Sequence, residues 1–167
     1  MQKIIRIERA LSHFDENLTE DCYALADTLE TDFCRKFIDC AAHSDKIVLF
    51  YGHNAEQCCL NYQADGVILD FGDENLVEKM SELRQKLGKN KFVGLFSRNR
   101  KHEAMLVSEA EPDFVVFKVW KDGAAHTKEL IDWYTTFFLI QCAAWLVDDG
   151  VEESVYERAD FVVRGLL

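Results

Sequence analysis

The sequence predicts a single α/β domain over residues 1–167 with a TIM-barrel-like (β/α) fold, incomplete at about seven parallel strands and six helices. From residue 46 onward, apolar runs begin about 20 to 25 residues apart, which is the length of one strand plus one crossover helix. These runs are apolar throughout, as expected for strands that are covered on both faces. The 167 residues include one proline and no linker-like tract. A doubly wound open sheet is the competing architecture.

The first elements are less regular than the later ones. We expect a strand at 4–8 and a polar loop at 12–17. Thr19 is a suitable N-cap for a helix that extends to about Ala41, because acidic residues follow Thr19 and apolar residues recur at helical spacing. A buried strand at 46–51 ends at Gly52, and Asn54 can cap a helix at 55–62.

The remaining elements alternate strictly. A strand at 67–70 precedes an amphipathic helix at 74–87, which Gly88 ends. A strand at 92–96 precedes a helix at 99–110, which Pro112 stops. Strand 113–120, helix 127–136, strand 138–147, helix 151–159 and strand 160–167 complete the series.

A barrel that is one strand short leaves two unpaired strand edges, and such edges aggregate unless they are covered. We therefore expect a homodimer. An aromatic group on the helix at 127–136 and just after it is either helix–sheet core or part of the subunit interface: Trp133, Tyr134, Phe137 and Phe138.

Charge and composition exclude several classes of protein. The net charge is −11 and no basic face is visible, so we expect no nucleic-acid partner. No segment approaches about 18 uninterrupted apolar residues and the N-terminus lacks a signal-peptide core, so we expect no membrane partner and a cytoplasmic location. The six cysteines contain no Cys-x-x-Cys pair, and no histidine has zinc-finger spacing. We expect reduced, mostly buried thiols.

Several segments, taken in order, form a recognisable series. They are Leu18-Thr19-Glu20 with Tyr23-Ala24-Leu25-Ala26 and Leu29, Ala64-Asp65-Gly66-Val67-Ile68-Leu69, Leu87-Gly88 with Phe92-Val93-Gly94, Glu103-Ala104 with Asp113-Phe114-Val115, and Ala159-Asp160-Phe161-Val162-Val163. This series resembles the thiamine phosphate synthases. The resemblance covers about residues 4 to 167 and implies a barrel that lacks the family's first βα unit and last helix. It also implies magnesium and the coupling of a hydroxymethylpyrimidine diphosphate to a thiazole phosphate.

The resemblance places most of the family's ligand-binding positions on residues of a different kind. The family's Gln-x-Arg-x-Lys strand end falls on Arg6-Ile7-Glu8-Arg9. Its Asn-Asp pair, whose Asp binds magnesium, falls on Tyr51-Gly52. Its Gly-Gly turn, which holds phosphate through backbone N–H groups, falls on Ala144-Trp145, where the Trp side chain would block close approach.

Two groups of candidate site residues remain. A second metal position of the family falls on Asp73, with Asp70 and His53 as further candidates for a magnesium site, and helix capping is the alternative role of Asp73. A hydroxyl and cationic side chains at strand ends and at a helix N-terminus favour a small phosphorylated ligand, although a solvated basic loop is the alternative. The candidates for phosphate binding are Ser97, Arg98, Arg100, Lys118 and Arg164.

The scaffold segments are kept and the site segments are mostly altered. This combination favours a divergent thiamine phosphate synthase-like barrel without pyrophosphorylase activity, which binds a small phosphorylated ligand or a protein partner. Two alternatives stay open: an active synthase with an altered site, and a structural or interaction module.

Overall fold

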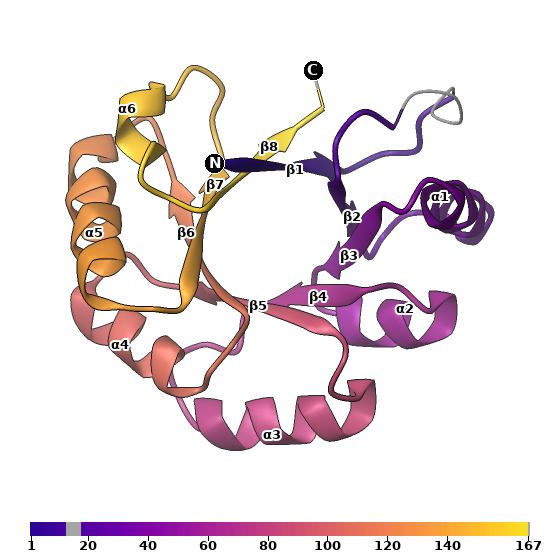
Figure 1. Cartoon of the computed structure of the whole chain (residues 1–167), viewed down its shortest axis with the longest axis horizontal. Coiled ribbons are helices and arrows are strands. Elements are labelled where there is room, and N and C mark those ends of the chain that lie inside the picture. The colour runs from indigo at the N-terminus through magenta and orange to yellow at the C-terminus, as the bar shows by residue number, and fades with distance from the viewer. Residues whose placement is uncertain (13–17, 167) are drawn as a thin grey trace.

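Eight parallel strands close into one barrel in the computed structural model, which describes residues 1–12 and 18–166 (Figure 1). The strands are β1 (Gln2–Ile7), β2 (Cys22–Ala26), β3 (Ile47–Tyr51), β4 (Gly66–Leu69), β5 (Phe92–Ser97), β6 (Phe114–Val119), β7 (Gln141–Leu146) and β8 (Phe161–Gly165). The helices are α1 (Thr31–His43), α2 (Ala55–Tyr62), α3 (Leu76–Leu87), α4 (Lys101–Glu109), α5 (Ala124–Phe137) and α6 (Glu153–Tyr156). Each strand pairs with the next, and β8 pairs with β1, so the TIM-barrel-like fold class is confirmed.

The expected count of seven strands is corrected to eight, because β2 lies where the sequence predicted the start of a long helix. Its residues are buried on both faces: Tyr23 and Leu25 pack on the helix side, whereas Ala24 lies inside the barrel. A short run that is apolar on both faces does not reveal its period, so its helix-like spacing misled the prediction. The helix itself begins at Thr31.

The expected loss of the first βα unit is also corrected. Both β1 and β2 are present and pair in parallel, with Ile4 opposite Cys22. Compared with a full set of eight strand–helix units, residues 1–12 and 18–166 contain no helix between β1 and β2 and no helix after β8. Most of the expected polar loop at 12–17 lies outside the described residues.

A closed barrel leaves none of its eight strands with an unpaired edge, so edge protection gives no reason for a homodimer. The homodimer stays a prediction. The members of the aromatic group on and after α5 differ in exposure. Tyr134 is fully buried, whereas Phe137 is 71% exposed and the nearby Leu139 is 103% exposed. These two exposed side chains are the remaining support for an interface on this surface.

Two apolar clusters stabilise the barrel. The larger one lies between the strands and the surrounding helices, and the smaller one fills the barrel interior. The interior cluster is built from inward-facing residues of successive strands, among them Ile4, Leu49, Ile68, Val116 and Val163. Strand alternation therefore decides which side chains can reach a site at the end of the barrel.

The Ala-Asp-type motifs of the sequence have a structural role at the N-terminal end of the barrel. Each of three aspartates directly precedes a strand. Its carboxylate accepts a hydrogen bond from a backbone N–H of the strand before, and its own N–H donates to a carbonyl of that same strand. The carboxylates are those of Asp65 on Val48 N (2.8 Å), Asp113 on Val93 N (2.7 Å) and Asp160 on Cys142 N (2.9 Å). We call these residues the aspartate clamps. They fix the pairing of β3 with β4, β5 with β6 and β7 with β8.

All six cysteines are in the reduced state, as expected. Cys34, Cys59 and Cys142 are buried, and the other three are half-buried. Burial raises the pKa of Cys142 to about 12, with a further contribution from the negative charge of Asp160. Within the described ranges, none of the helices has the length and apolar character needed to cross a membrane.

Candidate functional site

The carboxyl ends of the strands form one mouth of the barrel, which is where parallel barrels place their chemistry. Side chains alternate along a strand, so the residue two positions after an inward-facing one also faces inward. By this rule Arg6 follows Ile4 on β1, Tyr51 follows Leu49 on β3, and Trp145 follows Ala143 on β7. Phe96 and Lys118 occupy the matching places on β5 and β6. The mouth is therefore lined by three aromatic and two cationic side chains.

The three aromatic rings pack against one another across the mouth. The ring of Trp145 lies edge-on to Tyr51 and to Phe96, with centroid separations of 5.0 Å in both pairs and interplanar angles of 76° and 67°. Such edge-to-face contacts are favourable beyond the area that they bury. We call Tyr51, Phe96 and Trp145 the aromatic plug. Burial, followed by the charge of Glu8, raises the pKa of the Tyr51 phenol to about 12, so this group stays protonated.

Both cations of the mouth lie over rings of the aromatic plug. The Arg6 guanidinium lies 5.0 Å from the centroid of Trp145, and Lys118 Nζ lies 5.1 Å from that of Phe96. Arg6 also donates from Nη1 to the Leu146 carbonyl (3.0 Å). Arg6 Nε is 2.7 Å from Glu8 Oε1, an ion pair without hydrogen-bond geometry. The side chain of Arg6 is thus held in place.

A cavity of about 370 Å³ lies beside the plug, at the ends of β4, β5 and β6. It is lined by Asp70, Gly72, Phe96, Ser97, Arg98, Asn99, Arg100, Lys118 and Trp120. The structure thus brings together four of the five side chains that the sequence predicted to bind phosphate, with one of the two predicted metal ligands. We call this space the β4–β6 cavity.

The polar groups of the β4–β6 cavity differ in how firmly they are held. Ser97 is 8% exposed, and its hydroxyl donates to the Arg98 carbonyl (2.9 Å). The guanidinium groups are more exposed: Arg98 Nη1 is 3.8 Å from Asp73 Oδ2, and Arg100 Nη1 is 3.6 Å from Glu103 Oε1. The Arg98–Asp73 pair is long and exposed and contributes little to stability, so Arg98 can turn toward an anion. The Glu103 side chain, in contrast, is mostly buried.

The two predicted metal ligands are engaged separately. Asp70 Oδ1 accepts a hydrogen bond from Gly72 N (2.9 Å), and Asp73 faces Arg98. His53 is exposed, follows β3 and does not line the β4–β6 cavity. No group of three His, Cys, Asp or Glu side chains suited to a metal ion exists among the described residues. Magnesium is often held by one or two carboxylates plus substrate phosphates, so Asp70 and Asp73 fit it only as part of such a complex.

Arg164 is not among the residues that line the β4–β6 cavity. On β8, Val163 belongs to the barrel interior, so alternation places Arg164 on the opposite, helix-facing side together with Val162. The position of Arg164 near a strand end suggested a site residue. Successive side chains of a strand point to opposite faces, however, so Arg164 points away from the barrel interior that Val163 occupies.

Some side chains of the mouth were not predicted as site residues. Asn99 Nδ2 donates to the Lys118 backbone carbonyl (2.8 Å) and so connects the ends of β5 and β6. The backbone carbonyl of Asn99 lies 2.7 Å from His126 Nε2. Arg6 lines a separate cavity of about 360 Å³ at the ends of β1 and β8. Arg6 comes two residues after Ile4 in an apolar strand, and this spacing alone predicts that the charged side chain faces the same side as Ile4.

An all-parallel closed barrel with polar groups at the carboxyl ends of its strands defines the class: a TIM-barrel-like protein with its candidate site at the mouth. No family model matches the chain. The thiamine-phosphate synthase of Erythrobacter litoralis (strain HTCC2594) is 29% identical over 133 residues, which are 74% of this chain and 59% of that protein. The chain thus spans less than two thirds of this curated relative. It is a thiamine phosphate synthase-like barrel, as the sequence motifs predicted.

Solved structures give the same fold. The thiamine phosphate pyrophosphorylase of Pyrococcus furiosus superposes with a TM-score of 0.66 at 12% identity, covering 98% of this chain and 84% of that one. The orotidine 5'-monophosphate decarboxylase of Sulfolobus solfataricus gives 0.64 at 12% identity, with 98% and 87% covered. At these identities the likeness concerns the fold alone.

Proposed function

We propose that this protein is a non-catalytic thiamine phosphate synthase-like barrel that binds a small phosphorylated ligand in the β4–β6 cavity. The single observation that carries the loss of catalysis is the aromatic plug. Trp145 contacts both Tyr51 and Phe96, so indole and phenyl rings occupy the space in which reacting groups would have to meet.

Loss of a diphosphate from carbon needs cations aimed at the charge that develops on the leaving group. The two cations nearest the barrel axis are instead placed over rings: Arg6 over Trp145 and Lys118 over Phe96. At the position where the resemblance implies a magnesium ligand, the chain has Tyr51-Gly52, which supply no carboxylate. The carboxylate of Asp27 lies against Gly52 instead and accepts a hydrogen bond from Asn54 N (2.7 Å). The geometry therefore supports a barrel that keeps its scaffold without the reaction.

The β4–β6 cavity retains the chemistry of an anion site. Helix α4 begins at Lys101 with no side-chain cap on its first turn, so its N–H groups and the positive end of its dipole are available beside the cavity. Arg98 supplies a mobile guanidinium, and the Ser97 hydroxyl can donate to an anion if it turns away from the Arg98 carbonyl. A phosphate monoester matches these donors.

Thermal unfolding with and without inorganic phosphate and diphosphate tests the phosphate site. Stabilisation of the wild type that is absent in Arg98→Ala is expected, since a ligand at about 100 times its Kd stabilises by about 2.7 kcal/mol. Arg164→Ala is the matched control, because Arg164 lies outside the cavity and should leave the shift intact. No shift in the wild type near millimolar ligand, or the same shift in Arg98→Ala, would contradict the phosphate site.

An active thiamine phosphate synthase with an altered site is the second candidate. It is favoured by the 29% identity with an enzyme of that name and by the placement of Asp70 with Lys118 in one cavity. Magnesium held by Asp70 and Asp73 would then have to bind through the diphosphate. Product formation from the two substrates distinguishes the candidates.

A further inference from the structure

We infer that the N-terminal end of the barrel, opposite the mouth, is a second binding site, which takes a small aromatic molecule. A cavity of about 510 Å³ opens there, within the usual size range of small-molecule sites. Its wall is mainly apolar and includes Ile4, Cys22, Ile47, Leu49, Phe92 and Phe161. Neither the phosphate site nor the aromatic plug contributes to this space, which we call the basal cavity.

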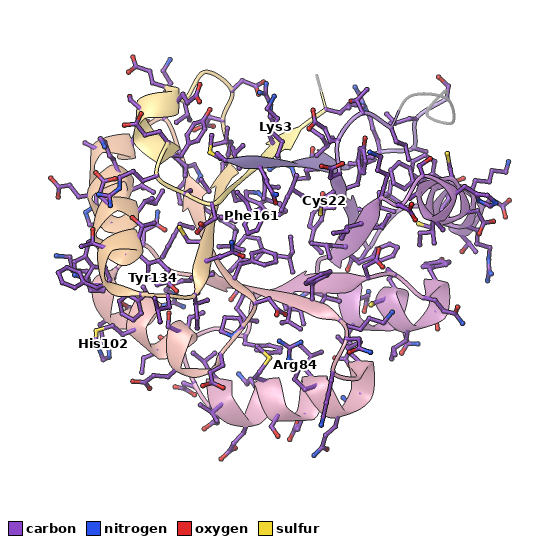
Figure 2. All side chains as sticks on the ribbon, viewed as in Figure 1. Lys3, Cys22, Arg84, His102, Tyr134 and Phe161 are labelled. Carbon is purple, nitrogen blue, oxygen red and sulfur yellow. The ribbon has the colours of Figure 1, made fainter. Side chains whose placement is uncertain are left out.

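The basal cavity exists because the inward side chains nearest the N-terminal end of the barrel differ in size. On one side, β5, β6 and β8 supply Phe92, Phe114 and Phe161. On the other side, β2 supplies Cys22, a much smaller side chain. Figure 2 shows Cys22 and Phe161 inside the ring of strands, on β2 and β8, the two strands that flank β1. A layer with large residues on one side and a small one opposite leaves room between them.

Glycine directs one of the rings away from the centre. The ring of Phe114 lies against Gly94 so closely that a Cβ on Gly94 would come within 2.4 Å of it. Phe114 therefore leans toward β5 and stacks at a tilt on Phe161, with the ring centroids 5.6 Å apart. The middle layer of the barrel, including Ile4 and Leu49, forms the floor. The result is an aromatic wall over an apolar floor.

Two carboxylates at the rim are paired, and the thiol in the wall is neutral. Lys3 and Glu20 also reach the rim, with opposite charges. Asp21 is 3.2 Å from Lys46 Nζ, and Asp113 is 2.9 Å from Arg84 Nη2. Part of Cys22 faces the open cavity, yet the surrounding protein desolvates the thiol, and with the charge of Asp65 this raises its pKa to about 12. The wall favours an apolar, ring-shaped ligand, because aromatic rings pair favourably with Phe92 and Phe161.

Indole is the probe that we would use, in calorimetric titration and ligand-observed NMR of the whole protein. Cys22→Phe fills the open side of the cavity and should raise the Kd for indole by about tenfold or more. Cys40→Phe makes the same change on α1, outside the cavity, and should leave the Kd within about twofold. Failure of indole to saturate the wild type, or equal binding by Cys22→Phe, would overturn the inference.

A second variant guards against misfolding of Cys22→Phe. Phe161→Ala removes half of the aromatic pair, and it should also weaken indole binding by about tenfold while circular dichroism confirms the fold. Addition of inorganic phosphate should leave the Kd for indole unchanged, since the two sites lie at opposite ends of the barrel. Competition between phosphate and indole, or full binding by Phe161→Ala, would contradict a separate basal site.

Discussion

The indole of Trp145 on β7 meets the phenol ring of Tyr51 on β3 edge-on, with their centroids 5.0 Å apart, across the mouth of a closed eight-stranded barrel. The two strands are four positions apart in the barrel, so the contact crosses its axis. A site that must admit two substrates needs this space open. The contact therefore connects the sequence changes at two separate strand ends to one physical consequence.

Trp145→Ala should destabilise the protein by about 3 kcal/mol, because it removes a buried ring with contacts on two sides and leaves a cavity. Trp120→Ala is the matched control: Trp120 is 43% exposed, and its loss should cost less than about 1 kcal/mol. Urea unfolding followed by circular dichroism measures both. Equal costs for the two variants would mean that the aromatic plug is not a packed unit.

Gly94→Ala should cost about 2 kcal/mol, since the added methyl group must displace the Phe114 ring from its position in a packed core. Gly165→Ala provides the comparison within the same barrel. A Cβ at Gly165 would find only an ordinary contact, 3.8 Å from Arg6, and should change stability by less than about 0.5 kcal/mol. Denaturant midpoints of the two variants test the packing, and a tolerated alanine at Gly94 would show that Phe114 does not press on β5.

Asp160→Ala should cost about 2 kcal/mol, because it removes a charge-assisted hydrogen bond and leaves the N–H of Cys142 without its side-chain acceptor. Asp149→Ala is a suitable control, since Asp149 is exposed and has no hydrogen bond or ion pair within the described ranges. Guanidinium unfolding of both variants decides the point. If the cost at Asp160 were no larger than at Asp149, the aspartate clamps would contribute nothing to strand pairing.

These clamps explain which parts of the sequence were informative. The Ala-Asp-Gly-Val-type segments that indicated the fold contain Asp65 and Asp160, which hold strands together at the N-terminal end of the barrel. Their spacing follows the βα repeat, so the fold class could be predicted from the sequence. They lie at the end opposite the site and therefore carry no information on activity.

Two features could not be predicted, each for a physical reason. Strand β2 is short and apolar on both faces, so its residues fit a helix equally well until they are seen to bridge β1 and β3. Of the candidate site residues, Ser97 and Lys118 line one cavity and Arg164 does not, and their roles in ligand binding stay predictions. The contact between Tyr51 and Trp145 depends on closure of the barrel, which sequence spacing did not reveal.

Alkaline pH should destabilise the fold. Burial raises the pKa of Tyr51 from 10.0 to about 12 and that of Cys142 from 9.0 to about 12. Above about pH 9 the unfolded chain therefore loses protons that the folded chain retains, and stability that is complete below this pH falls as the pH approaches 12. Urea midpoints at several pH values from about 8 to 11 should decline, and less so in Cys142→Ala. A midpoint that rises over this range would contradict the burial of these groups.

The formation of thiamine phosphate from hydroxymethylpyrimidine diphosphate and thiazole phosphate, with magnesium, is the most direct test of the loss of catalysis. An active thiamine phosphate synthase serves as the positive control, and product is measured over many equivalents of protein. With the mouth occupied by Tyr51, Phe96 and Trp145, we expect no product above the protein-free background. Repeated turnover by the wild type that is abolished in Asp73→Asn would contradict the proposal and establish the altered-site enzyme.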